Sequence, residues 1–237
     1  MKTLSACFAI ILAVLATACT APGDAQDKSI LPTNGQVLRG AADEARIKGS
    51  PDAPIRVVEV SDFQCPYCRQ FHFETLTQID SAYIETGKIR YIWVSFVNPG
   101  HDLAFASSEA AFCAGAVGKF WAMHDILFER QAEWSALPDA YGAFVEYAGE
   151  IGIDEESFGG CVRNSRLASL VISDFSNVTR AGINSTPYLI IADSLTLRGA
   201  ADFATFAGVV DGVLDGTTPD SAAAAPPDTA SAVPGVS

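Results

Sequence analysis

The sequence predicts an α/β protein whose sheet is interrupted by an all-helical insertion. Two apolar runs rich in β-branched residues, at 55–60 and 89–97, flank a helical pattern over 66–86. A strand–helix–strand unit of this length favours parallel strands joined by a right-handed crossover. Helical patterns then fill residues 99–182. Strand and helix patterns resume after the insertion, at 188–192, 195–198 and 203–214.

Turn residues delimit the first strand–helix–strand unit. A turn at 51–54 precedes the first strand, and Gly87 ends the helix, on which apolar residues recur at roughly helical spacing. The tripeptide Asn98-Pro99-Gly100 stops the second strand. In the second half, Asp193-Ser194 is a hairpin signal between the two short strands.

The insertion carries its own helix boundaries. Residues 105–113 form an apolar helical pattern that ends at the glycines within 115–118, and residues 120–128 form a second. The other boundaries are marked by three kinds of residue: proline in a first turn, aspartate at an N-cap and glycine beyond a helix end. The remaining helices are expected over 138–149, after Asp154, and from Ser165 to Gly182.

Composition excludes some classes of partner. The chain has 237 residues, 28 acidic against 15 basic, and a formal net charge of −13. An acidic protein is poorly suited to nucleic acid or to anionic lipid surfaces, so we expect no nucleic-acid partner. The hydrophobic content of 49% is sufficient for a sizeable core.

The N-terminus is expected to be a targeting segment. Lys2 precedes an apolar run over 4–15 that is too short to span a membrane comfortably, and small residues follow at 16–18. Cys19 comes next, which resembles the lipobox of bacterial lipoproteins, although Ala16 stands where that motif most often has Leu. Either Cys19 is lipidated, or the segment is cleaved to give a soluble periplasmic protein.

The number of cysteines favours lipidation. Cys7 would leave with the signal peptide, and a lipidated Cys19 would leave four cysteines that can form two pairs. An unmodified Cys19 would be an odd thiol in an oxidising compartment. The expected division of the chain is a signal peptide (1–18), a flexible tether (19–40), a first sheet segment (41–98), the helical insertion (99–182), a second sheet segment (183–215) and a disordered tail (216–237).

The motif Cys65-Pro66-Tyr67-Cys68 lies where the first strand meets its helix. Free N–H groups and the helix dipole stabilise negative charge there, and the thiolate is the reactive form of cysteine. The spacing lets the two sulfurs reach one another, so the pair can alternate between dithiol and disulfide. Half of a zinc site and an inert structural disulfide are the alternatives. Redox chemistry is favoured because no second cysteine pair or suitably spaced histidine pair accompanies the motif.

Several segments together resemble the DsbA-like thioredoxin-fold proteins of bacterial envelopes, in their thioredoxin_4-type branch. The matching residues lie at 49–55, 59–68, 118–125 and Thr186-Pro187. The resemblance implies a thioredoxin fold with an inserted helical domain, and thiol–disulfide exchange as the activity. It does not specify the direction of electron flow.

The resemblance implies particular roles for residues in these segments. Cys65 is the expected nucleophile and Cys68 the resolving thiol, and the intervening Pro66 and Tyr67 would tune the reduction potential. Glu59 interrupts an apolar strand; it is either an exposed acid at a sheet edge or, on a central strand, a buried one with a raised pKa. In the resembling family an acid at this position is thought to shuttle a proton to the buried thiol.

Thr186 and Pro187 are expected to bind substrate. A proline before a strand is often only a turn, but thioredoxin folds place a cis-proline here that faces the disulfide and binds an extended peptide. Ser185 stands where the family usually has glycine.

Cys113 and Cys161 lie in two different predicted helices of the insertion. They are either buried free thiols or, because thiols close together in an oxidising compartment tend to pair, a second, structural disulfide, which we favour. His72, His101 and His124 are interpreted as structural, and no metal or cofactor is expected.

The sequence thus predicts an envelope thiol–disulfide oxidoreductase, with an oxidase favoured over a reductase. Its partners would be cysteine-containing exported proteins and a membrane redox partner, and we expect a monomer. Isomerase activity is disfavoured because only a short segment precedes the fold. A different class, a lipid-anchored module that binds peptides or copper with little turnover, remains the alternative.

Overall fold

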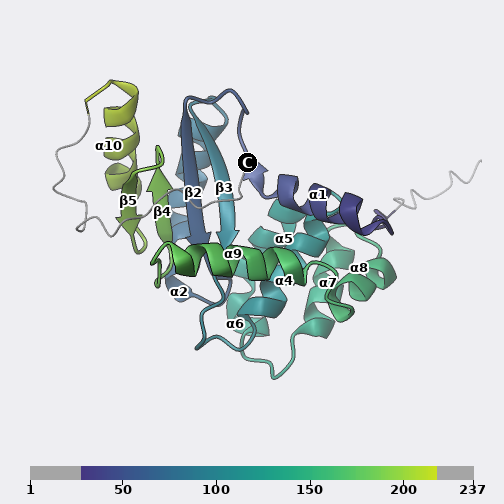
Figure 1. Cartoon of the computed structure of the whole chain (residues 1–237). Coiled ribbons are helices and arrows are strands. Elements are labelled where there is room, and N and C mark those ends of the chain that lie inside the picture. Colours follow the sequence, from purple (N-terminus) through teal and green to yellow (C-terminus); the bar gives the residue numbers. More distant parts are fainter. Residues whose placement is uncertain (1–27, 218–237) are drawn as a thin grey trace, which may run out of the picture.

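The computed structural model describes residues 28–217. These residues form a mixed sheet flanked by helices, with strand order β1-β3-β2-β4-β5 (Figure 1). β2 and β3 are parallel, and the other neighbouring strands are antiparallel. The strands are β1 (Ile47–Lys48), β2 (Ile55–Ser61), β3 (Ile89–Ser95), β4 (Tyr188–Ile191) and β5 (Leu195–Arg198). The predicted α/β fold with a helical insertion is confirmed.

The first crossover is a continuous helical segment from Pro66 to Ile84. It consists of α2 (Pro66–Phe71), η1 (His72–Leu76), α3 (Thr77–Ile79) and η2 (Asp80–Ile84), of which η1 and η2 are π-helical. The helices that follow are α4 (Ala104–Gly115), α5 (Phe120–Glu129), α6 (Gln131–Trp134), α7 (Tyr141–Glu150), α8 (Glu155–Arg163), α9 (Ala168–Arg180) and α10 (Phe203–Leu214); α1 (Gly35–Ala45) precedes the sheet.

The two faces of the sheet bury different helices because side chains alternate along a strand. Val57 and Tyr91 face the segment 66–84 and α10, where Phe71 and Phe206 are fully buried. The neighbouring residues Val58 and Ile92 face the other way and pack with Val178 of α9. Figure 1 shows α9 crossing in front of the strands, with α10 beside β5 and α4 to α8 gathered away from it.

Some helix boundaries differ from the sequence prediction. α7 begins at Tyr141 rather than at Pro138, and the short α6 was not predicted. α9 begins at Ala168 because Ser165, the predicted start, has a positive φ of 47° and lies outside the helix. Asp154 caps α8 as predicted, since its carboxylate accepts a hydrogen bond from the Ser157 N–H.

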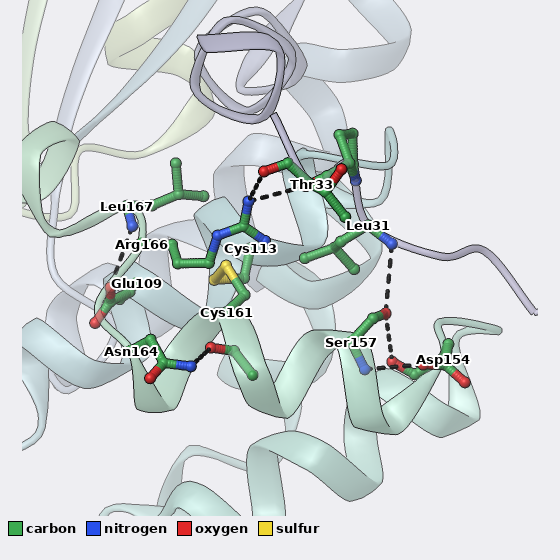
Figure 2. Close-up of a disulfide and its surroundings, with 12 residues drawn as sticks. Leu31, Thr33, Glu109, Cys113, Asp154, Ser157, Cys161, Asn164, Arg166 and Leu167 are labelled. Atoms are coloured by element: carbon green, nitrogen blue, oxygen red, sulfur yellow. Dashed lines mark hydrogen bonds between the residues drawn. A yellow bond between two sulfur atoms is a disulfide. The ribbon is translucent and has the colours of Figure 1, made fainter. Parts of the chain in front are cut away.

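The prediction of a flexible tether is wrong for the described residues of 19–40. Asn34 caps α1, and Leu31 and Leu38 are buried in the core of the helical insertion. Arg166 donates hydrogen bonds to the carbonyls of Pro32 and Thr33, and the Leu31 N–H donates to Ser157 (Figure 2). The segment is mostly small and polar, so its sequence pattern did not indicate that a few apolar residues pack it against the core.

The short edge strand β1 was also missed. Two residues pair with β3, Ile47 opposite Ile92 and Lys48 opposite Tyr91, which is too few for a periodic pattern. Gly49 follows with φ +90°, and its Cα lies so close to the Ile89 carbonyl that a side chain there would clash.

A disulfide joins α4 to α8 inside the helical part. Cys113 and Cys161 are both fully buried and are bonded at 2.03 Å (Figure 2). Glu109, one turn before Cys113 on α4, accepts a hydrogen bond from the Leu167 N–H, and burial raises its pKa to about 7. The bond links two helices of the insertion, which is the pairing favoured from the sequence.

Other sequence predictions fall on residues outside those described. These are the signal peptide at 1–18, Cys19 with its proposed lipid, and residues 218–237 of the predicted tail. Within residues 28–217, no helix has the length and apolar character needed to cross a membrane.

Candidate active site

Cys65 lies at the junction between β2 and α2, and it is the N-cap residue of α2. Pro66 occupies the first turn, where its missing N–H leaves no helical bond unmade. The Cys65 Sγ lies 3.6 Å from the carbonyl oxygen of Thr186, and the Thr186–Pro187 peptide bond is cis. Tyr67 is 63% exposed and Cys65 is 5% exposed, whereas Cys68 is fully buried. The loop before β4 therefore lies against the more accessible of the two sulfurs.

The two thiols have opposite ionisation behaviour. The hydrogen bond from Cys68 is the largest cause that lowers the pKa of Cys65 from 9.0 to about 6, and burial opposes it. Burial, reinforced by the neighbouring Cys65, raises the pKa of Cys68 well above 9.0. Both cysteines are free in this structure, so the pKa difference favours a thiolate on Cys65 and a thiol on Cys68. This asymmetry suits a nucleophile and a resolving thiol.

Glu59 is buried on the central strand, 1% exposed, on the face of β2 that packs against the crossover helix. The Tyr91 hydroxyl donates a hydrogen bond of 2.8 Å to its carboxylate. Burial raises the pKa of Glu59, while His124, Tyr91 and Lys48 lower it. Glu59 also acts electrostatically on Cys68, raising the pKa of that thiol. The exposed-edge alternative for Glu59 is therefore wrong.

The Ser61 hydroxyl lies two residues beyond Glu59 on the same face of β2. It is close enough to lower the pKa values of both Glu59 and Cys68, without a hydrogen bond of good geometry to a described residue. A hydroxyl can donate and accept, so it can carry a proton between the two groups.

A hydrogen-bond network fixes the loop that presents Cys65. The Asp62 carboxylate is fully buried, accepts from the Gln64 N–H and lies 2.7 Å from His101 Nδ1. Burial raises the pKa of Asp62. The Gln131 amide donates to the carbonyls of Phe63 and Cys65 at 2.6 and 3.0 Å. The first cysteine is thus held in place from the helical insertion as well as from the sheet.

His72, one helical turn beyond Cys68, clusters with His124 and Asp125 of α5. Their donor atoms lie within 4.8 Å of one another, and imidazole and carboxylate are metal-binding groups. A metal-ligating imidazole ordinarily donates its other N–H to a neighbouring acceptor. Among the described residues, His72 Nδ1 and His124 Nε2 have no such partner. The donor atoms alone do not make a built metal site.

The structure brings most of the candidate residues together. Cys65, Cys68 and Glu59 converge at the carboxyl end of β2, and Thr186 and Pro187 lie against them from the far half of the chain. The Cys113–Cys161 pair lies elsewhere, in the helical part. Sequence reasoning missed some residues of the site: Ser61, Asp62, Tyr91, His124 and Gln131. For Tyr91 a signal existed, because parallel pairing of the two predicted strands places it near Glu59.

Comparison with known proteins decides the family. A family model described as thioredoxin (Thioredoxin_4) matches residues 41–211. The chain belongs to this thioredoxin family. Solved structures confirm that the chain shares the fold of DsbA-like proteins. Bacillus subtilis BdbD superposes with a TM-score of 0.66 at 22% identity, over 79% of this chain and 97% of that one. Wolbachia pipientis α-DsbA1 gives 0.64 at 21% identity, over 73% and 92%.

Curated relatives match this thioredoxin-family chain over part of their length. A Rickettsia bellii protein provisionally named protein-disulfide oxidoreductase is 28% identical over 136 residues, which are 57% of this chain and 51% of that protein. The Na(+)/H(+) antiporter NhaA 1 of Salinispora arenicola is 30% identical over 150 residues, 63% of this chain but 22% of the antiporter. The chain thus spans about half of the first relative and about a fifth of the second.

Proposed function

We propose that this protein is a thiol–disulfide oxidoreductase that acts on cysteines of exported proteins, with Cys65 as nucleophile and Cys68 as resolving thiol. The observation that carries the proposal is the pair itself: a thiolate-prone Cys65 at a helix N-terminus, hydrogen-bonded to a buried Cys68 whose pKa is raised. The name of the Rickettsia relative supports the same activity.

In the oxidising direction, a substrate thiolate attacks the Cys65 sulfur of the Cys65–Cys68 disulfide. The bond between the two enzyme sulfurs breaks, Cys68 leaves as a thiolate and takes up a proton. A second substrate thiolate then attacks the substrate sulfur of the mixed disulfide and releases Cys65 as a thiolate. The substrate loses two electrons, and the enzyme gains them.

Glu59 is the proposed source of the proton for Cys68. Its raised pKa keeps a share of the carboxyl protonated closer to neutral pH, and it acts electrostatically on Cys68. Thr186 and Pro187 are the proposed contact for the substrate backbone, which would pair with this loop as an added strand. The position of Thr186 against Cys65 supports this role.

An oxidase is favoured over a reductase because a stabilised thiolate on Cys65 favours the reduced enzyme. A pair whose reduced form is stabilised is a strong oxidant. Equilibration with glutathione buffers tests this directly. We expect a reduction potential closer to about −120 mV, as in dithiol oxidases, than to about −270 mV, as in thioredoxin-type reductases. A value near the second would make the protein a reductase.

Two variants test the assignment of the cysteines. Cys65→Ser should abolish exchange with a model dithiol peptide. Cys68→Ser, mixed with the same peptide in its disulfide form, should accumulate the mixed disulfide, because Cys65 attacks the peptide disulfide and no resolving thiol follows. The adduct is visible as an added mass that thiols remove. Full biological activity of the Cys65→Ser, Cys68→Ser double variant would support the alternative of a binding module instead.

The proposed place of action is the cell envelope, with lipid attachment through Cys19 and recharging by a membrane redox partner. The N-terminal apolar run and the cysteine parity support this. Mass spectrometry of the mature protein checks it: a diacylglyceryl modification on Cys19 is expected, and a mature chain with an unmodified N-terminus would contradict the anchor. We expect a monomer, which light scattering tests.

A further inference from the structure

A buried acid that gives its proton to Cys68 must regain it from solvent. Glu59 is 1% exposed, and its hydrogen-bond donor Tyr91 and the thiol of Cys68 are fully buried. None of these three groups reaches water directly. The question is therefore which side chains connect Glu59 to the surface.

His124 of α5 is a buried histidine that contacts a partly exposed acid, Asp125. Its ring is fully buried, and its charge is, after burial, the largest influence on the pKa of Glu59. Trp121 links the two sites: its ring centroid lies 4.8 Å from that of His124 and 6.3 Å from that of Tyr91, which bonds Glu59. His124 and Glu59 thus share one buried region between the sheet and α5.

The two nitrogens of His124 have different surroundings. Nδ1 lies 2.9 Å from a carboxylate oxygen of Asp125, whose side chain is 48% exposed. Nε2 is buried and has no hydrogen-bond partner among residues 28–217. One end of the imidazole therefore contacts a group in water, and the other is left free within the interior. A buried unpaired nitrogen carries a free-energy cost that a functional role would explain.

We propose that His124 and Asp125 form the outer half of a proton route between Glu59 and solvent. This inference rests on the proposed function and extends it. Asp125 takes a proton from water and passes it to His124 Nδ1, and His124 gives the proton on Nε2, through one interposed water, to the Glu59 carboxylate. Glu59 has by then given its own proton to the Cys68 thiolate released from the disulfide. In the reverse direction the same steps remove the Cys68 proton. Both residues act through Glu59 and touch neither sulfur.

The charged groups around His124 are compatible with this route. His72 on η1 faces the ring at a centroid distance of 5.0 Å, and burial lowers its pKa to about 4, so it stays neutral near pH 7. The ammonium group of Lys48 on β1 lies over the Trp121 ring, 4.2 Å from its centroid. It also forms an ion pair with Asp80. Glu59 on β2 and Asp125 on α5 are acids whose pKa values His124 lowers.

The route can be tested by following reduction of the Cys65–Cys68 disulfide by dithiothreitol in full-length protein between pH 5 and 8. Asp125→Asn removes the outer proton acceptor. Because Asp125 is partly exposed, this variant should fold normally. His124→Gln interrupts the route between Asp125 and Glu59. Positioned proton transfer contributes roughly 10²–10⁴-fold, and water can replace part of it, so we expect slowing by about tenfold with an altered pH profile. Glu129→Gln, an exposed acid on the same helix, is the matched control and should keep the wild-type rate.

Two further measurements separate a proton route from a structural effect. A proton route accelerates reduction and oxidation of the Cys65–Cys68 pair equally. The equilibrium constant between this pair and glutathione should therefore change less than twofold in Asp125→Asn. In a Glu59→Gln background, Asp125→Asn should cause no further slowing, because the route then has no end point. High formate concentrations should restore the rate of Asp125→Asn but not that of Glu59→Gln.

The outcomes distinguish this inference from the function on which it rests. A wild-type disulfide that never exchanges with dithiothreitol or glutathione overturns the proposed function and the route with it. Normal wild-type exchange, combined with a wild-type rate in Asp125→Asn or equal slowing in the Glu59→Gln background, overturns the route alone.

Discussion

The sulfur of Cys65 lies 3.6 Å from the carbonyl oxygen of Thr186, although 121 positions separate the two residues in the chain. Cys65 is the N-cap residue of α2, before the helical insertion, and Thr186 precedes β4, after the insertion. The two halves of the sheet domain therefore meet at the reactive sulfur. A substrate held by the second half would be presented to a nucleophile supplied by the first.

The ionisation of Cys65 gives a first prediction. In the reduced protein, alkylation of Cys65 by iodoacetamide should follow a titration with its midpoint near pH 6, because the Cys68 thiol stabilises the thiolate. Cys68→Ala removes that hydrogen bond and should move the midpoint upward. A midpoint near 9.0 in the wild type would contradict the arrangement.

The same shift predicts how the stability of the reduced protein depends on pH. A depressed folded-state pKa stabilises the protein fully above the ordinary value of 9.0 and loses that contribution as the pH falls through about 6. The free energy of unfolding of the reduced protein, measured against Cys65→Ser, should therefore rise between these two pH values. Urea titrations at several pH values give this difference, and a flat difference would contradict it.

Glu59 should lower the free energy of unfolding at neutral pH, because a buried carboxyl with a raised pKa is costly to ionise. Burial raises its pKa above 4.5, so its stabilising contribution is complete below that value and is lost as the pH rises through the raised pKa. Glu59→Gln should therefore raise the free energy of unfolding at pH 7, by on the order of 1 kcal/mol, with little change at pH 4. Exposed Glu129→Gln is the control, and equal gains in both variants would refute the explanation.

A buried ion pair anchors α1 and β1 to α9. Arg46 Nη1 lies 2.6 Å from Asp174, which also accepts from the Ser95 N–H at 2.9 Å, and both charged side chains are about 2–3% exposed. Asp174→Ala leaves the Arg46 charge buried and should destabilise the protein by about 3–5 kcal/mol. Asp43→Ala removes the exposed partner of the same arginine and should cost about 1 kcal/mol or less. Chemical denaturation compares the two, and similar losses would contradict the distinction.

The Cys113–Cys161 disulfide closes a loop with a sequence separation of 48. Loop-closure entropy predicts a loss of about 4 kcal/mol on replacing both cysteines by serine. The disulfide lies in the helical part, away from Cys65, so the reduction potential of the Cys65–Cys68 pair should not change. Thermal unfolding and glutathione equilibration test the two statements separately. An altered potential would show that the two pairs are coupled.

Much of this architecture could be predicted from local patterns. β2, the Cys-Pro-Tyr-Cys motif and α2 are contiguous, so strand propensity, proline position and helix capping all act within a few residues. β5 also has the predicted bounds, because the turn at Ala192 and Asp193, both with positive φ, is a short-range feature. β1 and the start of α1 were not predicted from the sequence. A two-residue strand and a helix with two buried residues leave too weak a periodic signal.

The sequence by itself determined the fold class, the position of the cysteine pair at a strand-to-helix junction and the place of Glu59 on an apolar strand. Each of these follows from interactions between residues close in the chain, or from the alternation of a strand. Only the tertiary structure decided which groups surround that acid: Tyr91 from β3, His124 from α5 and Lys48 from β1. Ionisation and proton transfer depend on through-space distances of a few ångströms, and these arise when distant segments pack together.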